Sequence, residues 1–180
     1  NNASTPLEAF TISVLENTSN ACADFYQDGF QLTVGQDTSA PSSLTKPNKG
    51  IPYTDPAYGT CVVRVSDHTQ EANNPARIRN DYSRRNPFNA DNSRILTYAQ
   101  GGRWLVYDAS NLDYVRELPL GGGSTEPQWH HSDPNLIFYG PNNGGLVIRQ
   151  YNIVTSQSQV VTDFTNVTAI NGFAGSTDVR

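Results

Sequence analysis

The chain has 180 residues and a formal net charge of −5, with only 16% charged residues, 14 glycines and 11 prolines. This length suits one ordinary core, and the composition favours many short strands joined by tight turns over a helical bundle or a disordered acidic tail. Because the chain is acidic and has no clustered Lys and Arg, we expect no nucleic acid partner.

The sequence predicts no transmembrane segment, because no apolar run approaches the roughly 20 residues that span a bilayer. The chain begins at Asn1 and contains no methionine, which indicates a processed or partial product. Removal of a secretory signal is the simplest explanation. We therefore expect a secreted, cell-surface or periplasmic protein.

Residues 1–49 are predicted to form an N-terminal β-strand extension and a linker. Within them, residues 10–15 and 30–34 alternate apolar and polar side chains with a period of two, as half-buried strands do. Residues 36–50 are rich in Ser, Thr, Pro and Lys and are predicted to be extended. The sequence leaves open whether this segment is a separate small β-domain or completes the following domain, residues 50–180.

Cys22 and Cys61 are the only cysteines of the chain. They are either two buried thiols or a disulfide, and we favour the disulfide, which would close a loop of about 40 residues and stabilise the fold by about 4 kcal/mol. A disulfide indicates an oxidising compartment. Glycosylation sequons at Asn2, Asn17 and Asn166 agree with an exported glycoprotein.

Two further segments precede the most regular part of the chain. Residues 58–66 are rich in β-branched side chains and predict a strand. Residues 67–85 are polar, lack periodicity and exceed the length of an ordinary connection. We expect them to form a loop that protrudes from one face.

From residue 86 onward a pattern of about 42 residues occurs twice. Trp129 follows Phe88 after 41 residues, Asp133 follows Asp91 after 42, and a third copy begins near Asn171 and breaks off. No helix longer than about two turns is expected. The predicted strands are residues 94–98, 103–107 and 114–118 in the first copy and 135–139, 146–153 and 158–161 in the second.

A period of this size built from short strands is typical of β-propeller blades. Each copy has an aromatic opening strand, an Asp-containing turn, an apolar strand and a third strand that ends in Tyr-Asp or Tyr-Asn. In these features residues 86–120 and 126–164 resemble the propeller superfamily that includes the Tol-system periplasmic protein and the tryptophan-aspartate repeats. The resemblance implies an all-β fold of propeller-type repeats, two full blades plus partial ones in an incomplete ring, and no particular activity.

A shorter likeness concerns activity. Residues 127–137 resemble a segment of the oligogalacturonate lyases, seven-bladed propellers that bind a divalent metal through histidines. This implies a metal-dependent lyase or hydrolase acting on acidic polysaccharide, with His130, His131 and His68 as ligands. On a strand, His130 and His131 are expected to point to opposite faces. The alternative is a turn in which Asp133 caps backbone amides and both histidines face solvent, which needs no cofactor.

Two blades do not close a ring, since propellers have about 4 to 8 blades. The chain is then a portion of a longer protein, or several copies close one ring, or open strand edges pair with neighbouring subunits. An unpaired end blade is expected to expose Ile95, Ile137 and Phe138.

The function that we favour is a non-catalytic binding or assembly module, a structural protein that self-assembles through strand edges. Its expected partners are protein subunits or copies of itself, and polysaccharide. The metal-dependent lyase or hydrolase is the alternative. Four side chains have the chemistry to stack on or hydrogen-bond sugars, with blade core or turns as their alternative role: Trp104, Trp129, Asn142 and Asn143.

Overall fold

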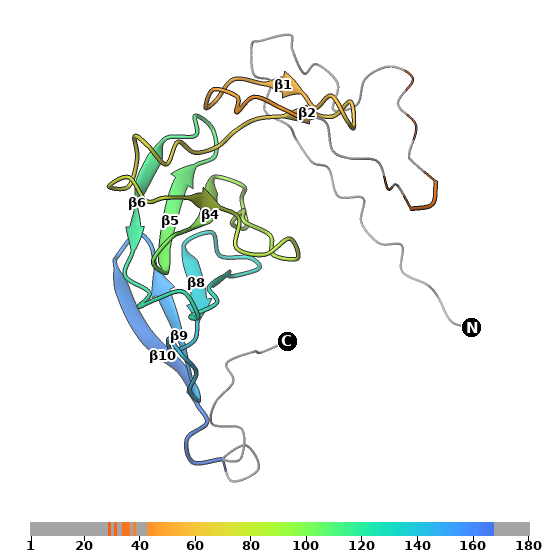
Figure 1. Ribbon diagram of the computed structural model, residues 1–180. Coiled ribbons are helices and arrows are strands. Elements are labelled where there is room, and N and C mark those ends of the chain that lie inside the picture. The colour runs from red at the N-terminus through yellow and green to blue at the C-terminus, as the bar shows by residue number, and fades with distance from the viewer. Residues whose placement is uncertain (1–28, 30, 32–33, 37, 39–42, 168–180) are drawn as a thin grey trace, which may run out of the picture. The chain divides into compact units, whose positions relative to one another are not determined.

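The computed structural model describes residues 29, 31, 34–36, 38 and 43–167, and this part of the chain contains strands and no helix (Figure 1). The all-β class predicted from the sequence is confirmed. No described segment forms a helix long and apolar enough to cross a membrane. Several predictions lie outside the described residues: the strand at 10–15, most of the strand at 30–34, Cys22, Asn2, Asn17 and the third copy from Asn171.

The chain divides into two compact units. The smaller comprises Asn1–Lys46 and Pro52–Val63, and the larger comprises Pro47–Ile51 and Arg64–Arg180. The boundary predicted between residues 49 and 50 stays a prediction. Within the larger unit Lys49 forms a parallel bridge with Arg64, which explains why its segment belongs there.

The described part of the smaller unit contains a short antiparallel hairpin of β1 (Tyr53–Thr54) and β2 (Cys61–Val62). Asp55 stabilises the connection, because its Oδ1 accepts a hydrogen bond from the backbone N–H of Ala57 at 2.8 Å. The connection between β1 and β2 includes the first residues of the strand predicted at 58–66. Of those nine residues, only the two of β2 belong to a strand of this sheet.

The larger unit contains two four-stranded antiparallel sheets in which each strand pairs with its neighbours in the sequence (Figure 1). The first sheet consists of β3 (Ile78–Arg79), β4 (Arg94–Ala99), β5 (Arg103–Asp108) and β6 (Tyr114–Leu118). The second consists of β7 (Gln128–Trp129), β8 (Leu136–Tyr139), β9 (Val147–Asn152) and β10 (Gln157–Asp163). The six strands predicted in this region agree with the observed ones to within two residues at either end.

The turn between β4 and β5 requires glycine. Gly101 and Gly102 both have positive φ, at 87° and 79°, a conformation that glycine adopts without steric cost. A Cβ at Gly102 would lie only 2.5 Å from the backbone nitrogen of Gly123. The glycine pair therefore sets both the tight turn and the close approach of the chain that follows β6.

Two clusters of buried side chains lie on the two faces of the first sheet. The cluster between the sheets consists of Leu96, Trp104, Val106, Leu118, Leu120, Ile137 and Tyr151. The cluster on the opposite face consists of Ala72, Ile95, Ala99, Leu105 and Tyr107. Successive residues of β4 and of β5 alternate between the clusters, as the period of two in a strand requires.

The second sheet contributes to a buried cluster through one face only. Its other face, here called the outer face, lies opposite Ile137 and Tyr151 and carries Leu136, Phe138 and Ile148, all half-buried. Within the described residues, neither cluster of fully buried side chains lies on this face. The two sheets are therefore covered to different extents.

The expectation that Ile95 and Ile137 are exposed is wrong. Ile95 is 5% exposed because Ala72 and its neighbours cover it, and Ile137 is 0% exposed because it lies between the sheets. Phe138, on the other face of β8, is half-buried, and its ring lies 5.3 Å from that of His130.

Residues 67–85 do not form the protruding loop that was expected. The Glu71 carboxylate accepts a hydrogen bond at 2.9 Å from the hydroxyl of Tyr107 and pairs with Lys49. Burial, with the hydrogen bond to Glu71 as a second cause, raises the pKa of the Tyr107 hydroxyl. These contacts hold the segment against the first sheet, and the chain then enters that sheet as β3.

Candidate functional site

His130 and His131 lie beyond the end of β7, in the turn that leads to β8. Their rings are stacked, with centroids 4.7 Å apart and an interplanar angle of 25°. The expectation that they point to opposite faces is therefore wrong, because that rule applies to residues within a strand and β7 ends at Trp129.

The His130 ring caps this turn. Its Nδ1 accepts hydrogen bonds from the backbone N–H groups of Asp133 at 3.0 Å and Ser132 at 3.2 Å. The Asp133 carboxylate in turn accepts one from the backbone of Asn135 at 2.9 Å. Accepting with Nδ1 requires a neutral ring whose proton is on Nε2, so this geometry uses His130 as a turn residue.

The three histidines are not gathered into one group in the described part of the chain. His68 uses its Nδ1 in a contact of 3.0 Å with the carbonyl of Pro75. No group of three or more His, Cys, Asp or Glu residues that could hold a metal ion occurs among the described residues.

Trp104 belongs to the core and is 2% exposed. Its ring packs edge-on against Tyr98, with centroids 5.2 Å apart, and its Nε1–H donates to the carbonyl of Gly122 at 2.8 Å. The binding role predicted for Trp104 is therefore not available in this structure, because the ring and its donor are both occupied.

Trp129 connects the two sheets. It packs half-buried against the cluster between them, and its Nε1–H donates to the carbonyl of Pro87 at 2.9 Å. This contact fixes the start of the second sheet to the segment that leads into β4.

Asn142 and Asn143 are exposed in the connection between β8 and β9. The hydroxyl of Ser124 donates to Oδ1 of Asn142 at 2.8 Å and accepts from the backbone N–H of Asn143 at 2.8 Å. The two asparagines thus tie the connection between β8 and β9 to the connection between β6 and β7. Of the four predicted binding residues, Trp104 and Asn142 both lie near Gly122. Trp129 instead contacts Pro87, in the segment that leads into β4.

The modification sites predicted from the sequence are only partly described. Asn166 is exposed in a turn after β10, while Thr168 of its sequon lies outside the described residues. Cys61 begins β2, and because Cys22 also lies outside, their disulfide stays a prediction.

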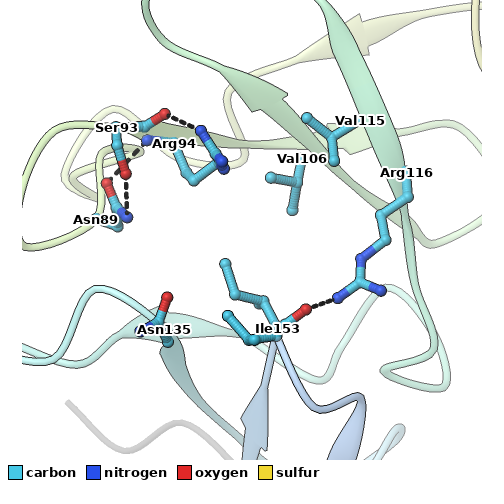
Figure 2. A pocket seen from close by; sticks show the side chains of 9 residues that line it. Asn89, Ser93, Arg94, Val106, Val115, Arg116, Asn135 and Ile153 are labelled. Carbon is cyan, nitrogen blue, oxygen red and sulfur yellow. Dashed lines mark hydrogen bonds between the residues drawn. The ribbon is translucent and has the colours of Figure 1, made fainter.

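A pocket between the two sheets was not predicted. It has a volume of about 230 Å³, and we call it the inter-sheet pocket. Figure 2 shows residues of both sheets around it. The side chains that define it come from the first sheet and the turn before β4, namely Asn89, Arg94, Val106 and Arg116, and from turns of the second sheet, namely Asn135 and Ile153. The sequence could not reveal it, since the lining residues come together only when the sheets pack.

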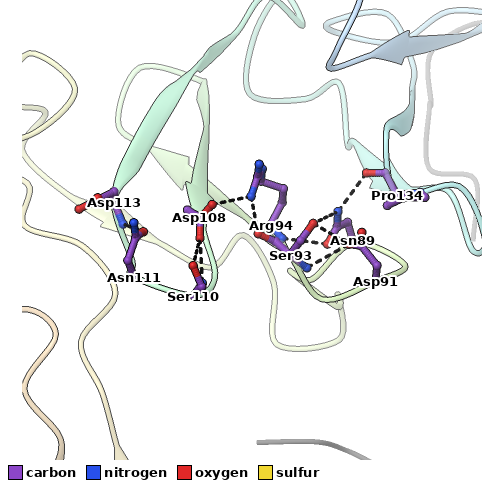
Figure 3. A network of polar contacts seen from close by, with 9 residues as sticks. All are labelled: Asn89, Asp91, Ser93, Arg94, Asp108, Ser110, Asn111, Asp113 and Pro134. Carbon is purple, nitrogen blue, oxygen red and sulfur yellow. Dashed lines mark hydrogen bonds and ion pairs between the residues drawn. The ribbon is translucent and has the colours of Figure 1, made fainter. Parts of the chain in front are cut away.

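The turns beside the pocket are held by aspartates (Figure 3). The carboxylate of Asp91 accepts from the hydroxyl of Ser93 at 2.6 Å, and that of Asp108 accepts from Ser110 at 2.5 Å. These hydroxyl donors, followed by the backbone N–H groups of the same serines, lower the pKa of both carboxyls. Asp108 also pairs with Arg94 at 2.6 Å.

Two further turns of the described residues have the same hydrogen bonds, at Asp67-His68-Thr69 and Asp163-Phe164-Thr165. The hydroxyl of Thr69 lowers the pKa of Asp67 to about 2, and the hydroxyl of Thr165 lowers that of Asp163. The aspartate at the first position accepts from both the hydroxyl and the backbone N–H of the third residue. This short spacing is a sequence signal for such turns, although Asp81-Tyr82-Ser83 has the same spacing and Asp81 pairs with Arg85 instead.

Comparisons with protein-family models, with curated proteins and with solved structures find no match to the chain. Function is therefore inferred from the chain's own residues.

Proposed function

We propose that the protein is a non-catalytic binding and assembly module of the propeller type, whose outer face packs against a sheet of another copy. The supporting observation is the unequal cover of its two sheets in the described part of the chain. The first sheet has a buried cluster on each face, and the second has one only toward the first. Propeller blades bury both faces by stacking, so the outer face is suited to a further sheet.

Matching hydrogen bonds support a common repeat in the two sheets. The backbone N–H of Ala109 donates to the carbonyl of Ser93 at 3.0 Å, and that of Ile153 donates to Asn135 at 2.9 Å. The turns after β5 and after β9 are each closed by a backbone hydrogen bond of 2.9 Å between residues four apart. Equivalent positions of the two copies therefore have equivalent roles, as in consecutive blades.

The outer face has the composition of a sheet-packing surface. Leu136, Phe138 and Ile148 provide apolar contacts, and the residues opposite the latter two are uncharged: Gln150 is paired with Phe138, and Thr162 with Ile148. A second sheet can cover such a face without burying an unpaired charge.

The irregular edge of β10 favours self-association through the outer face over self-association through the strand edge. Val160 and Val161 are about half-exposed, at 50% and 48%, but the pairing of β10 with β9 shifts register between Val160 and Thr162. An irregularity of this kind at a sheet edge opposes the addition of another strand. We therefore place self-association on the outer face, whereas the sequence alone pointed to strand edges.

The carboxylates described above support a structural role. Asp91 and Asp108 are hydrogen-bonded to serines of their own turns, and Glu71 is bonded to Tyr107 and Lys49. In Asp91 and Asp108 the serine hydrogen bonds favour the ionised carboxylate and hold the turns.

The proposal is tested by light scattering after size exclusion of the full chain. We expect a particle mass that is a multiple of the 19.7 kDa chain mass. Phe138→Arg and Ile148→Arg place a charge on the outer face and should reduce the mass to that of one chain. Val154→Arg is the matched control, because Val154 is exposed in the turn after β9.

A wild-type particle of one chain mass at every concentration would refute self-association. The proposal also fails if Phe138→Arg and Ile148→Arg leave the mass of the assembly unchanged.

A further inference from the structure

Arg116 points toward the inter-sheet pocket without a carboxylate partner in the described part of the chain. Its guanidinium donates to the carbonyl of Ile153 and, at 3.1 Å, to the hydroxyl of Ser156. Arg94 and Arg103 of the same sheet instead pair with carboxylates, each at 2.6 Å. A partly buried guanidinium bound only to neutral acceptors keeps its positive charge uncompensated and attracts an anion.

A β-bulge brings a second side chain of β6 to the pocket beside Arg116. Val106 pairs with Arg116, and the next residue of β5, Tyr107, pairs with Tyr114, so Val115 is an extra residue of β6. The bulge allows both Val115 and Arg116 to line the pocket, although neighbours in a regular strand point to opposite faces.

The second sheet completes the pocket with one polar and one apolar group. Asn135 lines it, and within the described residues its side-chain amide forms no hydrogen bond; only its backbone is used. Ile153 lies beside it, and Figure 2 shows both facing Val106 and Val115 across the pocket. The pocket thus offers a cation, a free amide and an aliphatic wall.

We propose that the inter-sheet pocket binds a small organic carboxylate, with its carboxylate on Arg116 and its aliphatic part against Val106, Val115 and Ile153. A guanidinium binds a carboxylate through two parallel hydrogen bonds. The volume of about 230 Å³ lies below that of pockets for drug-sized ligands, which limits the ligand to a few carbon atoms. This inference is independent of the assembly proposal, since the pocket forms within one chain.

The first experiment is a titration of the full chain followed by NMR of its valine and isoleucine methyl groups. The probes are isobutyrate, its neutral analogue isobutyramide, and inorganic phosphate. We expect saturable shifts at Val106, Val115 and Ile153 with isobutyrate, with a dissociation constant on the order of 1 mM. The amide should give no saturable shift, because it lacks the charge, and phosphate should bind more weakly, because it has no apolar part.

Variants then test the assigned contacts. Arg116→Gln should weaken isobutyrate binding by about tenfold or more. Because Arg116 also bonds Ile153, its removal acts on the fold as well, and Val115→Phe provides a second test that fills the pocket and keeps the charge. Val115 is 47% exposed, so a larger side chain is tolerated there. Arg149→Gln, on an exposed arginine of β9, is the matched control and should bind normally.

The inference is overturned if isobutyramide binds as well as isobutyrate, or if folded Arg116→Gln and Val115→Phe both bind like the wild type. If phosphate binds more tightly than isobutyrate, the assignment of an organic carboxylate to the pocket is wrong. The absence of any saturable shift overturns the site altogether.

Discussion

Asn89, in the turn before β4, donates a hydrogen bond from Nδ2 to the carbonyl of Pro134, in the turn before β8, at 3.0 Å. The side chain is 3% exposed. It also donates to Ser93 and accepts from the backbone of Arg94. One buried amide therefore holds the turn before β4 and fixes the position of the second sheet relative to it.

Replacement of Asn89 should therefore destabilise the packing of the sheets. We expect Asn89→Ala to lower the free energy of unfolding by about 2 kcal/mol, because the backbone groups of Arg94 and Pro134 lose their partner inside the protein. Urea unfolding of the two proteins measures the difference. Asn166→Ala, at an exposed amide, should change the free energy little, and an equal effect of both variants would contradict the role of Asn89.

The stability of the protein should fall in acid. The pKa values of Asp67, Asp91 and Asp163 are lowered in the folded chain, that of Asp67 to about 2 from an ordinary 3.8. The stability that these carboxylates contribute is complete above pH 3.8 and is lost as the pH falls toward the lowered values.

Urea unfolding as a function of pH tests this behaviour. In the double variant Asp91→Asn with Asp163→Asn, the amide oxygen still accepts the turn hydrogen bonds but does not titrate, so the decline in acid should be shallower. High salt screens long-range repulsion between charges. The difference in slope between the wild type and the double variant should therefore remain at high salt. Parallel curves of unfolding free energy against pH for the two proteins would show that these turns do not cause the loss of stability in acid.

Variants of His130 test whether this residue holds a turn or binds a metal. His130→Asn keeps an acceptor for the backbone N–H groups of Ser132 and Asp133, so it should unfold close to the wild-type temperature. His130→Ala loses both hydrogen bonds and should cost about 1 kcal/mol. Added Mn²⁺, Zn²⁺ or Ca²⁺ should shift none of the three unfolding temperatures. A metal-dependent rise in the wild type that both variants lack would favour the lyase or hydrolase alternative.

The disulfide between Cys22 and Cys61 remains a prediction from the sequence, and peptide mapping without reductant should find the cross-linked pair. Its removal in Cys61→Ser should lower the free energy of unfolding by about 4 kcal/mol, because the loop of about 40 residues is no longer closed in the unfolded chain. A free thiol at both positions in the purified protein would contradict it.

Local patterns were sufficient to predict most strands of the two larger sheets. The alternation along β4 and β5 and the glycines between them determine those elements, so Leu96 and Trp104 could be assigned to strands in advance. The core position of Trp104 could not be decided, because a tryptophan beside a turn has the same sequence signature in a core as in a binding site.

The inter-sheet pocket could not be predicted, for a different reason. Val115 lines it beside Arg116 because Val115 is an extra residue in β6, and Asn135 lines it only when the second sheet packs on the first. Neither the bulge nor the contact between sheets has a local sequence signal. The cover of Ile95 by Ala72 was missed in the same way, since residues 67–76 have no periodicity that indicates contact with a sheet.

The pairing of every strand with its neighbours in the sequence also bears on how the chain folds. Hairpins form from segments that are close along the chain, and a low mean separation of contacts favours fast folding. The first sheet can assemble during synthesis before β7 has left the ribosome, and the second sheet can then dock on it. The bond between Asn89 and Pro134 spans 45 residues, so it closes only at this late docking step.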